Sequence, residues 1–134
     1  MAGDFEIEVA TPERLLIRER VTEAQIPAAN GMIGILPEHA PLLSELGVGE
    51  MSFQLGGERR SLVISGGWVE VRNNHVRVLA DKAELASEID VARAQSALKR
   101  AQERLASPTA ELDVGRAINA MRRAQARLAA AAER

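Results

Sequence analysis

Apolar and polar residues alternate with a period of two along the first part of the chain. The segment FEIEVA, from Phe5 to Ala10, is the clearest case, because apolar side chains there alternate with acidic ones. Such alternation predicts a β-strand with one buried and one solvated face. Similar segments follow, separated by turn sequences such as AANG, LGGE and RNNH, whose glycine and asparagine tolerate positive φ. The pattern predicts an antiparallel β-sandwich of about ten short strands.

The period changes near residue 87, where apolar side chains begin to recur every three or four residues. Ser87 is expected to cap a first helix, with Asp90 in its first turn. The proline in residues 106–110 disfavours helical geometry in the residue before it, so a second helix is expected after a short turn. The chain is therefore assigned a β-sandwich over residues 1–86 and an antiparallel α-helical hairpin over residues 87–134. The predicted apolar stripes are Val91, Ala94, Leu98, Ala101 and Leu105 on the first helix, and Val114, Ala117, Met121, Ala124, Leu128 and Ala131 on the second.

Alanine is frequent in both helical stripes, and this limits how firmly the hairpin can be held. Each alanine buries little apolar surface, which contributes about 25 cal/mol per Å2. Isolated helices of this length are also marginal in water. We therefore expect the hairpin to depend on the surface against which it docks, and to be a mobile element.

Composition and charge exclude several classes of protein. The chain has no cysteine, which rules out disulfides and thiolate metal sites. Its net charge of −2 does not favour nucleic acid as a partner. The N-terminal sequence lacks the features of a signal peptide, and no apolar run approaches the roughly 18 residues of a membrane span, so membrane association is expected to be indirect. Residues 1–86 are net acidic and residues 87–134 are net basic, so the C-terminal part is the place to look for an anionic ligand or partner.

No catalytic motif is recognisable in the sequence. The phosphate-binding loops and the nucleophile elbow are missing. His39 and His75 lie far apart, and neither has a second ligand at helical spacing. Glu6 and Glu8 share one strand face, which we interpret as solvated. The sequence thus favours a non-catalytic protein with no catalytic residues, no metal site and no required cofactor.

Four motifs follow one another across nearly the whole chain. They are GMIGILPEHAPLL, SGGWVEV, VRVLADKAE and EIDVARA, and the helical hairpin follows the last of them. In this order and spacing the chain resembles the epsilon subunit of bacterial F-type ATP synthase. The resemblance implies a non-catalytic rotor subunit of the central stalk that binds the gamma subunit and the polar loops of the c-ring. It also implies coupling of proton flow to rotation, restraint of ATP hydrolysis, and a peripheral location on the cytoplasmic face of the plasma membrane.

The glycines and prolines of the first motif predict a rigid loop at the rim of the sandwich. Gly31 and Gly34 permit tight bends, whereas Pro37 and Pro41 fix φ and stiffen the segment. By resemblance, this loop contacts the c-ring and the gamma subunit, and the residues assigned to the contact are Met32, Ile33, Leu36 and His39.

The sequence leaves the roles of three side chains, Met32, His39 and Trp68, open between alternatives. Several relatives carry an acidic residue at the position of Met32, so an apolar contact with the ring is expected here instead of a charged one. His39 is expected either to contact a partner or to tie the loop to its own sandwich by a hydrogen bond. The segment SGGWVEV is expected to form a hairpin, with Trp68 in the core and an interface position as the alternative.

The segment IDVARA matches a motif with which some bacterial relatives bind ATP. Asp90 and Arg93 are three residues apart and share a helix face. Arginine forks suit phosphate oxygens, whereas a carboxylate would serve the adenine or cap the helix. The residues that the resemblance assigns to a regulatory ATP site are Glu84, Ile89, Asp90, Arg93, Ala94, Arg100, Arg123 and Arg127. The structural alternative is that Asp90 only caps the first helix and that the arginines of the second form a solvated face.

These features lead to the hypothesis of a hairpin with two states. Folded, it packs on the sandwich and permits ATP hydrolysis; extended, it reaches the alpha/beta catalytic head beside gamma and blocks rotation. ATP would favour the folded state only to the extent that it binds that state more tightly. A free-standing ATP-sensing module is the alternative, and it would not co-purify with gamma. An enzyme is the third possibility, but no residues suggest an active site.

Overall fold

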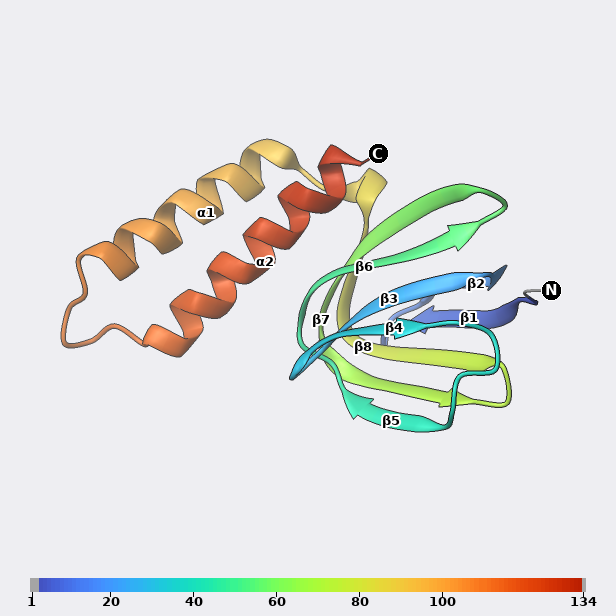
Figure 1. Ribbon diagram of the computed structural model, residues 1–134. Coiled ribbons are helices and arrows are strands. Elements are labelled where there is room, and N and C mark those ends of the chain that lie inside the picture. The colour runs from blue at the N-terminus through green and yellow to red at the C-terminus, as the bar shows by residue number, and fades with distance from the viewer. Residues whose placement is uncertain (1–2, 134) are drawn as a thin grey trace.

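The computed structural model describes residues 3–133 and contains, within them, eight strands, one short 3-10 helix and two α-helices (Figure 1). The elements are β1 (Phe5–Ala10), β2 (Leu15–Val21), β3 (Glu23–Ala28), β4 (Gly31–Ile35), β5 (Leu42–Glu45), β6 (Val48–Leu55), β7 (Glu58–Arg72), β8 (His75–Leu85), η1 (Ala86–Glu88), α1 (Val91–Ala106) and α2 (Val114–Ala132). The sandwich followed by a helical hairpin confirms the predicted fold class.

The two layers of the sandwich share their two longest strands. The first half of β7 pairs with β6, and its second half pairs with β5. β8 follows β7 through both layers and pairs at its beginning with β1. One layer therefore has the order β4-β3-β6-β7-β8, and the other the order β5-β7-β8-β1-β2. The pairs are antiparallel except for β1 and β8, which run parallel, so the sheet is mostly and not entirely antiparallel.

A bend replaces the hairpin expected in SGGWVEV. Gly66 and Gly67 have φ angles of +74° and +115°, and the chain turns there within the continuous strand β7. A β-carbon added at Gly67 would lie 2.1 Å from the carbonyl oxygen of Leu79 on β8. The two glycines thus let β7 change layers without losing its pairing with β8. One continuous strand therefore stands where two were expected, and residues 3–133 contain eight strands and not about ten.

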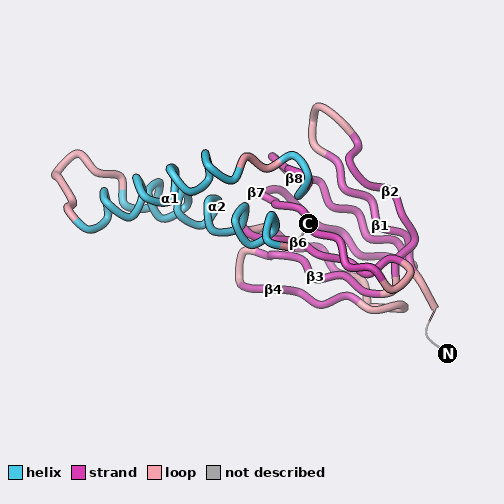
Figure 2. The backbone as a smooth tube through the Cα atoms, turned by 90° about the horizontal axis from the view of Figure 1, so that it is seen from above, coloured by secondary structure: helices cyan, strands magenta, loops and turns pink. Residues whose placement is uncertain are grey.

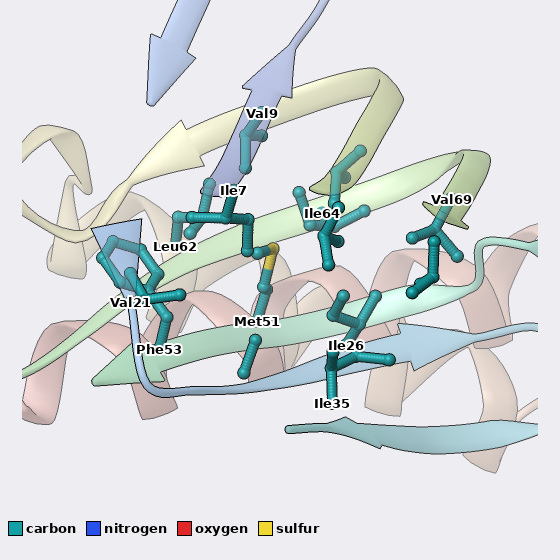
Figure 3. Packing of buried hydrophobic residues seen from close by; sticks show 14 of the residues in the cluster. Ile7, Val9, Val21, Ile26, Ile35, Met51, Phe53, Leu62, Ile64 and Val69 are labelled. Atoms are coloured by element: carbon teal, nitrogen blue, oxygen red, sulfur yellow. The ribbon is translucent and has the colours of Figure 1, made fainter. Parts of the chain in front are cut away.

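The core lies between the layers and follows the period-two pattern. On β1, Phe5, Ile7 and Val9 are buried, while Glu6 and Glu8 lie on the other face. Side chains from both layers meet in the close view of Figure 3, where Met51 and Phe53 of β6 lie among apolar side chains of other strands. The aliphatic residues labelled with them are Ile7, Val9, Val21, Ile26, Ile35, Leu62, Ile64 and Val69.

Both α-helices begin at an aspartate. The Asp90 carboxylate accepts a hydrogen bond from the Arg93 backbone N–H at 3.0 Å, and Asp113 accepts one from Arg116 at 3.0 Å. Ser87 was expected to cap α1, but it lies in η1. The pairing of β8 continues to Leu85 and η1 follows directly, so the helical geometry begins only after Asp90. A carboxylate at this N-cap position satisfies one of the free backbone donors of the first turn.

The hairpin docks on the sandwich through α2. Alanines of both predicted stripes are buried between the helices, whereas Val114, near the α1–α2 turn, is exposed. A second face of α2 packs Ala126 and Ala130 against Val63 of β7 and Ile89. Figure 2 shows the hairpin extending from one end of the sandwich, with the α1–α2 turn farthest away. The docked surface is therefore small and made largely of alanine.

The substitution Gly67→Ala should destabilise the protein by about 2–4 kcal/mol, because it combines positive φ with a clash against the β8 backbone. Gly57→Ala is the matched control, since Gly57 has a φ of +85° but open space around its missing β-carbon. It should cost only about 1 kcal/mol. Urea unfolding of both variants measures the difference, and equal losses would show that the close approach at Gly67 is unimportant.

Candidate functional site

The first part of GMIGILPEHAP is an edge strand and not a loop. Residues 31–35 form β4, which pairs with β3, so the predicted rim loop is confined to residues 36–41. Gly31 has a φ of +128°, as a tight bend requires. Gly34 does not have positive φ, and its missing side chain instead makes room for Gln25, whose amide would lie 3.3 Å from an added β-carbon. The period-two alternation of the strand decides which side chains face outward.

Met32 and Leu36 face solvent along the edge of the sandwich formed by β4. Their exposed fractions are 56% and 60%, which is high for large apolar side chains. Ile33 lies on the opposite face of β4 and packs partly against the core. Of the three apolar residues assigned to the ring contact, the structure therefore brings two to the surface.

The loop that follows β4 is held by its own contacts. His39 Nδ1 donates to the carbonyl oxygen of Ala40 at 2.7 Å, and the backbone N–H of His39 donates to Leu36 at 3.2 Å. The backbone N–H of Glu38 donates to the side chain of Asn74 in the β7–β8 turn. His39 therefore fixes the shape of the loop, and Asn74 ties the loop to the sandwich.

Trp68 is on the surface, so its expected place in the core is wrong. It is 52% exposed and stands opposite Leu79 of β8, which is also exposed. Its neighbour Val69 is buried. Because neighbouring residues of a strand point to opposite faces, the burial of Val69 turns the larger side chain outward.

The residues assigned to ATP lie along the base and the middle of the hairpin. Ile89 and Ala94 are buried, and Asp90 caps α1. Glu84, near the end of β8, forms an ion pair with Arg127 of α2. Arg93 is exposed. These residues thus lie at or near the junction of the hairpin and the sandwich.

A groove of about 690 Å3 lies between the two helices on the side of the α1–α2 turn. Arg100 and Arg123 line it, but the other assigned residues do not. Arg104 and Arg116, which the sequence analysis did not assign, line it as well. The signal that could have found them is the spacing of the arginines, which places them on the same helix faces as Arg100 and Arg123.

Three sets of polar contacts, which we call the docking contacts, join the hairpin region to the sandwich. Arg127 pairs with Glu84, as described above. Glu133, at the end of α2, accepts from Ser61 at 2.7 Å and also pairs with Arg59. Glu88 of η1 accepts two hydrogen bonds from Arg14, at 2.8 and 3.0 Å. All three carboxylates are at least partly solvated, so each contact contributes modestly.

Two of the docking contacts lower the pKa of a carboxyl group, that of Glu133 and that of Glu88. The Ser61 hydroxyl and then Arg59 hold the pKa of Glu133 below its ordinary value of 4.5. Arg14 and the Leu85 backbone N–H lower the pKa of Glu88 in the same way. The pKa of Glu50 is raised, first by burial and then by the charge of Glu133. Glu133 and Glu88 therefore favour the folded state when ionised.

A second polar cluster lies on the outer face of the β1 layer. Glu6, Glu8 and His75 are the only described group with the spacing of metal ligands. Arg18 lies 3.0 Å from Glu8, and its hydrogen bond is the main reason that the pKa of Glu8 is lowered. His75 Nε2 lies 3.0 Å from the same carboxylate. Because arginine already neutralises Glu8, we interpret the cluster as an ion-pair network.

Comparison with known proteins identifies the family. The model "ATP synthase, Delta/Epsilon chain, beta-sandwich domain" matches residues 4–86, and the model "ATP synthase, Delta/Epsilon chain, long alpha-helix domain" matches residues 87–132. The chain belongs to the ATP synthase delta/epsilon family. The resemblance noted in the sequence is confirmed, as is the assignment to a non-catalytic epsilon subunit of the central stalk.

Individual relatives agree with the family match. The ATP synthase epsilon chain of Solibacter usitatus is 54% identical over 108 residues, which cover 81% of either chain. That of Koribacter versatilis is 50% identical over 105 residues, covering 78% of this chain and 74% of the relative. A chain in the cryo-EM structure of the Euglena gracilis mitochondrial ATP synthase superposes with a TM-score of 0.82 at 24% identity, over 95% of this chain and 81% of that one. Among residues 3–133, no helix has the length and apolar character needed to cross a membrane.

Acid should release the end of α2 from the sandwich. Because the pKa of Glu133 is lowered on folding, its contribution is complete above pH 4.5 and is lost as the pH falls below that value. Hydrogen exchange of the α2 amides between pH 6 and pH 3, corrected for the intrinsic rate, should show this loss of protection.

Two variants test the assignment to Glu133. In Glu133→Gln, protection at pH 6 should already be reduced and should change less with pH. Glu103→Gln, on the exposed face of α1, should behave like the unmodified chain. If the Glu133→Gln and unmodified chains lose protection in parallel, another group controls the docking.

Proposed function

We propose that this subunit transmits rotation between the c-ring and the catalytic head through gamma, and that its hairpin regulates ATP hydrolysis. The family match over both parts of the chain supports a stalk role. The observation that carries the regulatory part is the small docking surface of α2, built on Ala126 and Ala130. A helix pair held by so little apolar surface can exchange that surface for another partner at low cost.

The partner contacts of the rotor fit the exposed edge of the sandwich at β4. Met32 on the edge strand β4 and Leu36 just beyond it are exposed, and the loop behind them is fixed by His39 and Asn74. A rigid apolar rim of this kind suits the loops of a c-ring, with gamma beside it. The location that follows is the cytoplasmic face of the bacterial plasma membrane, reached only through the complex.

The regulatory cycle would use two positions of the hairpin. In the docked position described here, α2 lies on β6 and β7, and hydrolysis proceeds. In the extended position the hairpin would leave the sandwich, follow gamma and reach the alpha/beta head, where basic side chains of α2 would oppose rotation. The free-energy cost of leaving the docked position comes from losing the docking contacts and from exposing the apolar side chain of Val63 to water.

ATP is the regulatory ligand that this proposal assigns to the docked hairpin. Arg127 and Glu84 already meet across the junction, and Arg93 stands exposed in the first turn of α1. A nucleotide that contacts α1, α2 and β8 together would bind only the docked state and shift the equilibrium toward it. Family membership favours this arrangement over a free-standing ATP sensor.

ATP should bind the purified chain, and Arg93→Ala should weaken the binding at least tenfold, because a bidentate contact with phosphate is lost. Calorimetric titration measures both affinities. Arg122→Ala is the control, since Arg122 is exposed on α2 and is not assigned to the site. If ATP does not bind, the IDVARA segment serves only to start α1. The proposed stalk role does not depend on that result.

Removal of residues 88–134 should raise the ATPase rate of the reconstituted complex several-fold, because the blocking element is gone. The rate is compared with that of the complex containing the full chain. Retention of the truncated chain with gamma on purification shows that the sandwich still assembles. An unchanged rate in an assembled complex would rule out inhibition by this hairpin.

A further inference from the structure

Glu50 lies on the face of the sandwich that α2 covers. It stands directly opposite Val63 in the pairing of β6 with β7, and Val63 stands opposite Glu84 in the pairing of β7 with β8. Directly opposed residues share one face of a sheet, so the three side chains form a row across the strands. Val63 packs against Ala126 and Ala130 of α2. The hairpin therefore docks on a row that has a carboxylate on either side of its apolar centre.

The two carboxylates of this row have different surroundings. Glu84 is neutralised by its ion pair with Arg127 of α2. The side chain of Glu50 is only 18% exposed, and its Oε2 atom is buried without a hydrogen-bond partner among residues 3–133. A buried carboxylate that lacks hydrogen bonds is costly to keep ionised. The docked hairpin thus covers one satisfied and one unsatisfied carboxylate.

A single guanidinium group serves two carboxylates beside this interface. Arg59 of β7 lies 3.6 Å from Glu50, which is too far for a hydrogen bond. The same guanidinium donates hydrogen bonds to Glu133 of α2 and to the Ser52 hydroxyl. Burial and then the charge of Glu133 raise the pKa of Glu50, and Arg59 offsets only part of that effect. Docking therefore brings a second negative charge to the cation nearest Glu50.

The neighbouring strands supply no further cation to Glu50. Among residues 3–133, Arg59 is the only positively charged group within 4.0 Å of it. On β3, Glu23 accepts a hydrogen bond from Gln25, and on β2, Glu19 lines a hollow beside Arg59. Both of these groups carry the same charge as Glu50, so they cannot neutralise it.

The charged groups of α2 leave Glu50 unpaired as well. Arg127 is engaged by Glu84, and Glu133 has the same sign as Glu50. Arg122 lies one turn before Ala126 and is exposed. A proton is thus the remaining means of neutralising Glu50 within the described interface.

We propose that Glu50 makes docking of the hairpin depend on protons, because docking is favoured when this carboxyl group is protonated and opposed when it is ionised. The protonated group has no charge to desolvate, and its hydroxyl can donate a hydrogen bond. The inference requires only that the hairpin can leave the sandwich. It requires neither ATP binding nor inhibition of hydrolysis.

The sign of the pH dependence follows from the raised pKa of Glu50. In the docked state this carboxyl group takes up a proton above its ordinary value of 4.5, whereas a released hairpin would leave it ionised there. Docking should therefore strengthen as the pH falls toward 4.5 and weaken as the pH rises. Below pH 4.5 the protonation of Glu133 acts in the opposite sense, so docking should pass through a maximum.

The first test measures hydrogen exchange of the α2 amides in the full chain at pH 5 and pH 8, corrected for the intrinsic rate. Protection in the unmodified chain should fall at least about threefold between these values. In Glu50→Gln, which imitates the protonated group, protection should stay constant and should exceed that of the unmodified chain at pH 8. Glu45→Gln is the matched control, since Glu45 is exposed on β5, and it should behave like the unmodified chain. An equal fall in Glu50→Gln would assign the effect to another group and overturn the proposal.

A second measurement does not depend on the folding of a Glu50 variant. Carboxyl NMR of the unmodified chain follows the titration of Glu50 directly, and its midpoint should lie above 4.5. Glu133→Gln removes one of the two causes, so it should lower that midpoint. A midpoint at or below 4.5 in the unmodified chain, or one that Glu133→Gln leaves unchanged, would overturn the proposal. Neither measurement involves ATP or the assembled complex, so the outcome is independent of the tests of the proposed function.

Discussion

The pairing of β7 with β8 through both layers of the sandwich is the contact on which the rest of the fold depends. It closes the core on one side, fixes β1 by parallel pairing and positions η1 and the hairpin at the end of β8. The pairing survives the change of layer only because Gly67 lets the two backbones approach closely. The hairpin follows directly from the end of β8 and packs on this sandwich through α2.

The hairpin is held by a different balance of forces. The core of the sandwich buries large aliphatic side chains, but α2 offers the sandwich mainly Ala126 and Ala130. Its polar docking contacts are partly solvated and depend on ionised carboxylates. The contact between α2 and the sandwich therefore buries much less apolar surface than the core between the two layers does.

Arginine has two distinct roles in the two parts of the molecule. In the sandwich, arginines such as Arg18 and Arg59 complete networks with glutamate and leave little free charge. Along the groove of the hairpin, Arg104 and Arg116 stand with no carboxylate at hand in the described structure. Charge that the fold does not neutralise is available to an anion from solution.

Local pattern was enough to determine the class of fold. The alternation in FEIEVA gave the buried face of β1, and the alanine spacing gave the contact between α1 and α2, because both follow from the geometry of a single element. Tertiary structure decided three further features: which face of β7 carries Trp68, whether SGG forms a turn or a bend, and where α1 begins. Each depends on a neighbouring strand: Val69 must fill the core, Gly67 must pass close to Leu79, and β8 must finish pairing before a helix can start. The groove between α1 and α2 likewise depends on tertiary structure, because it forms only where the two helices lie side by side.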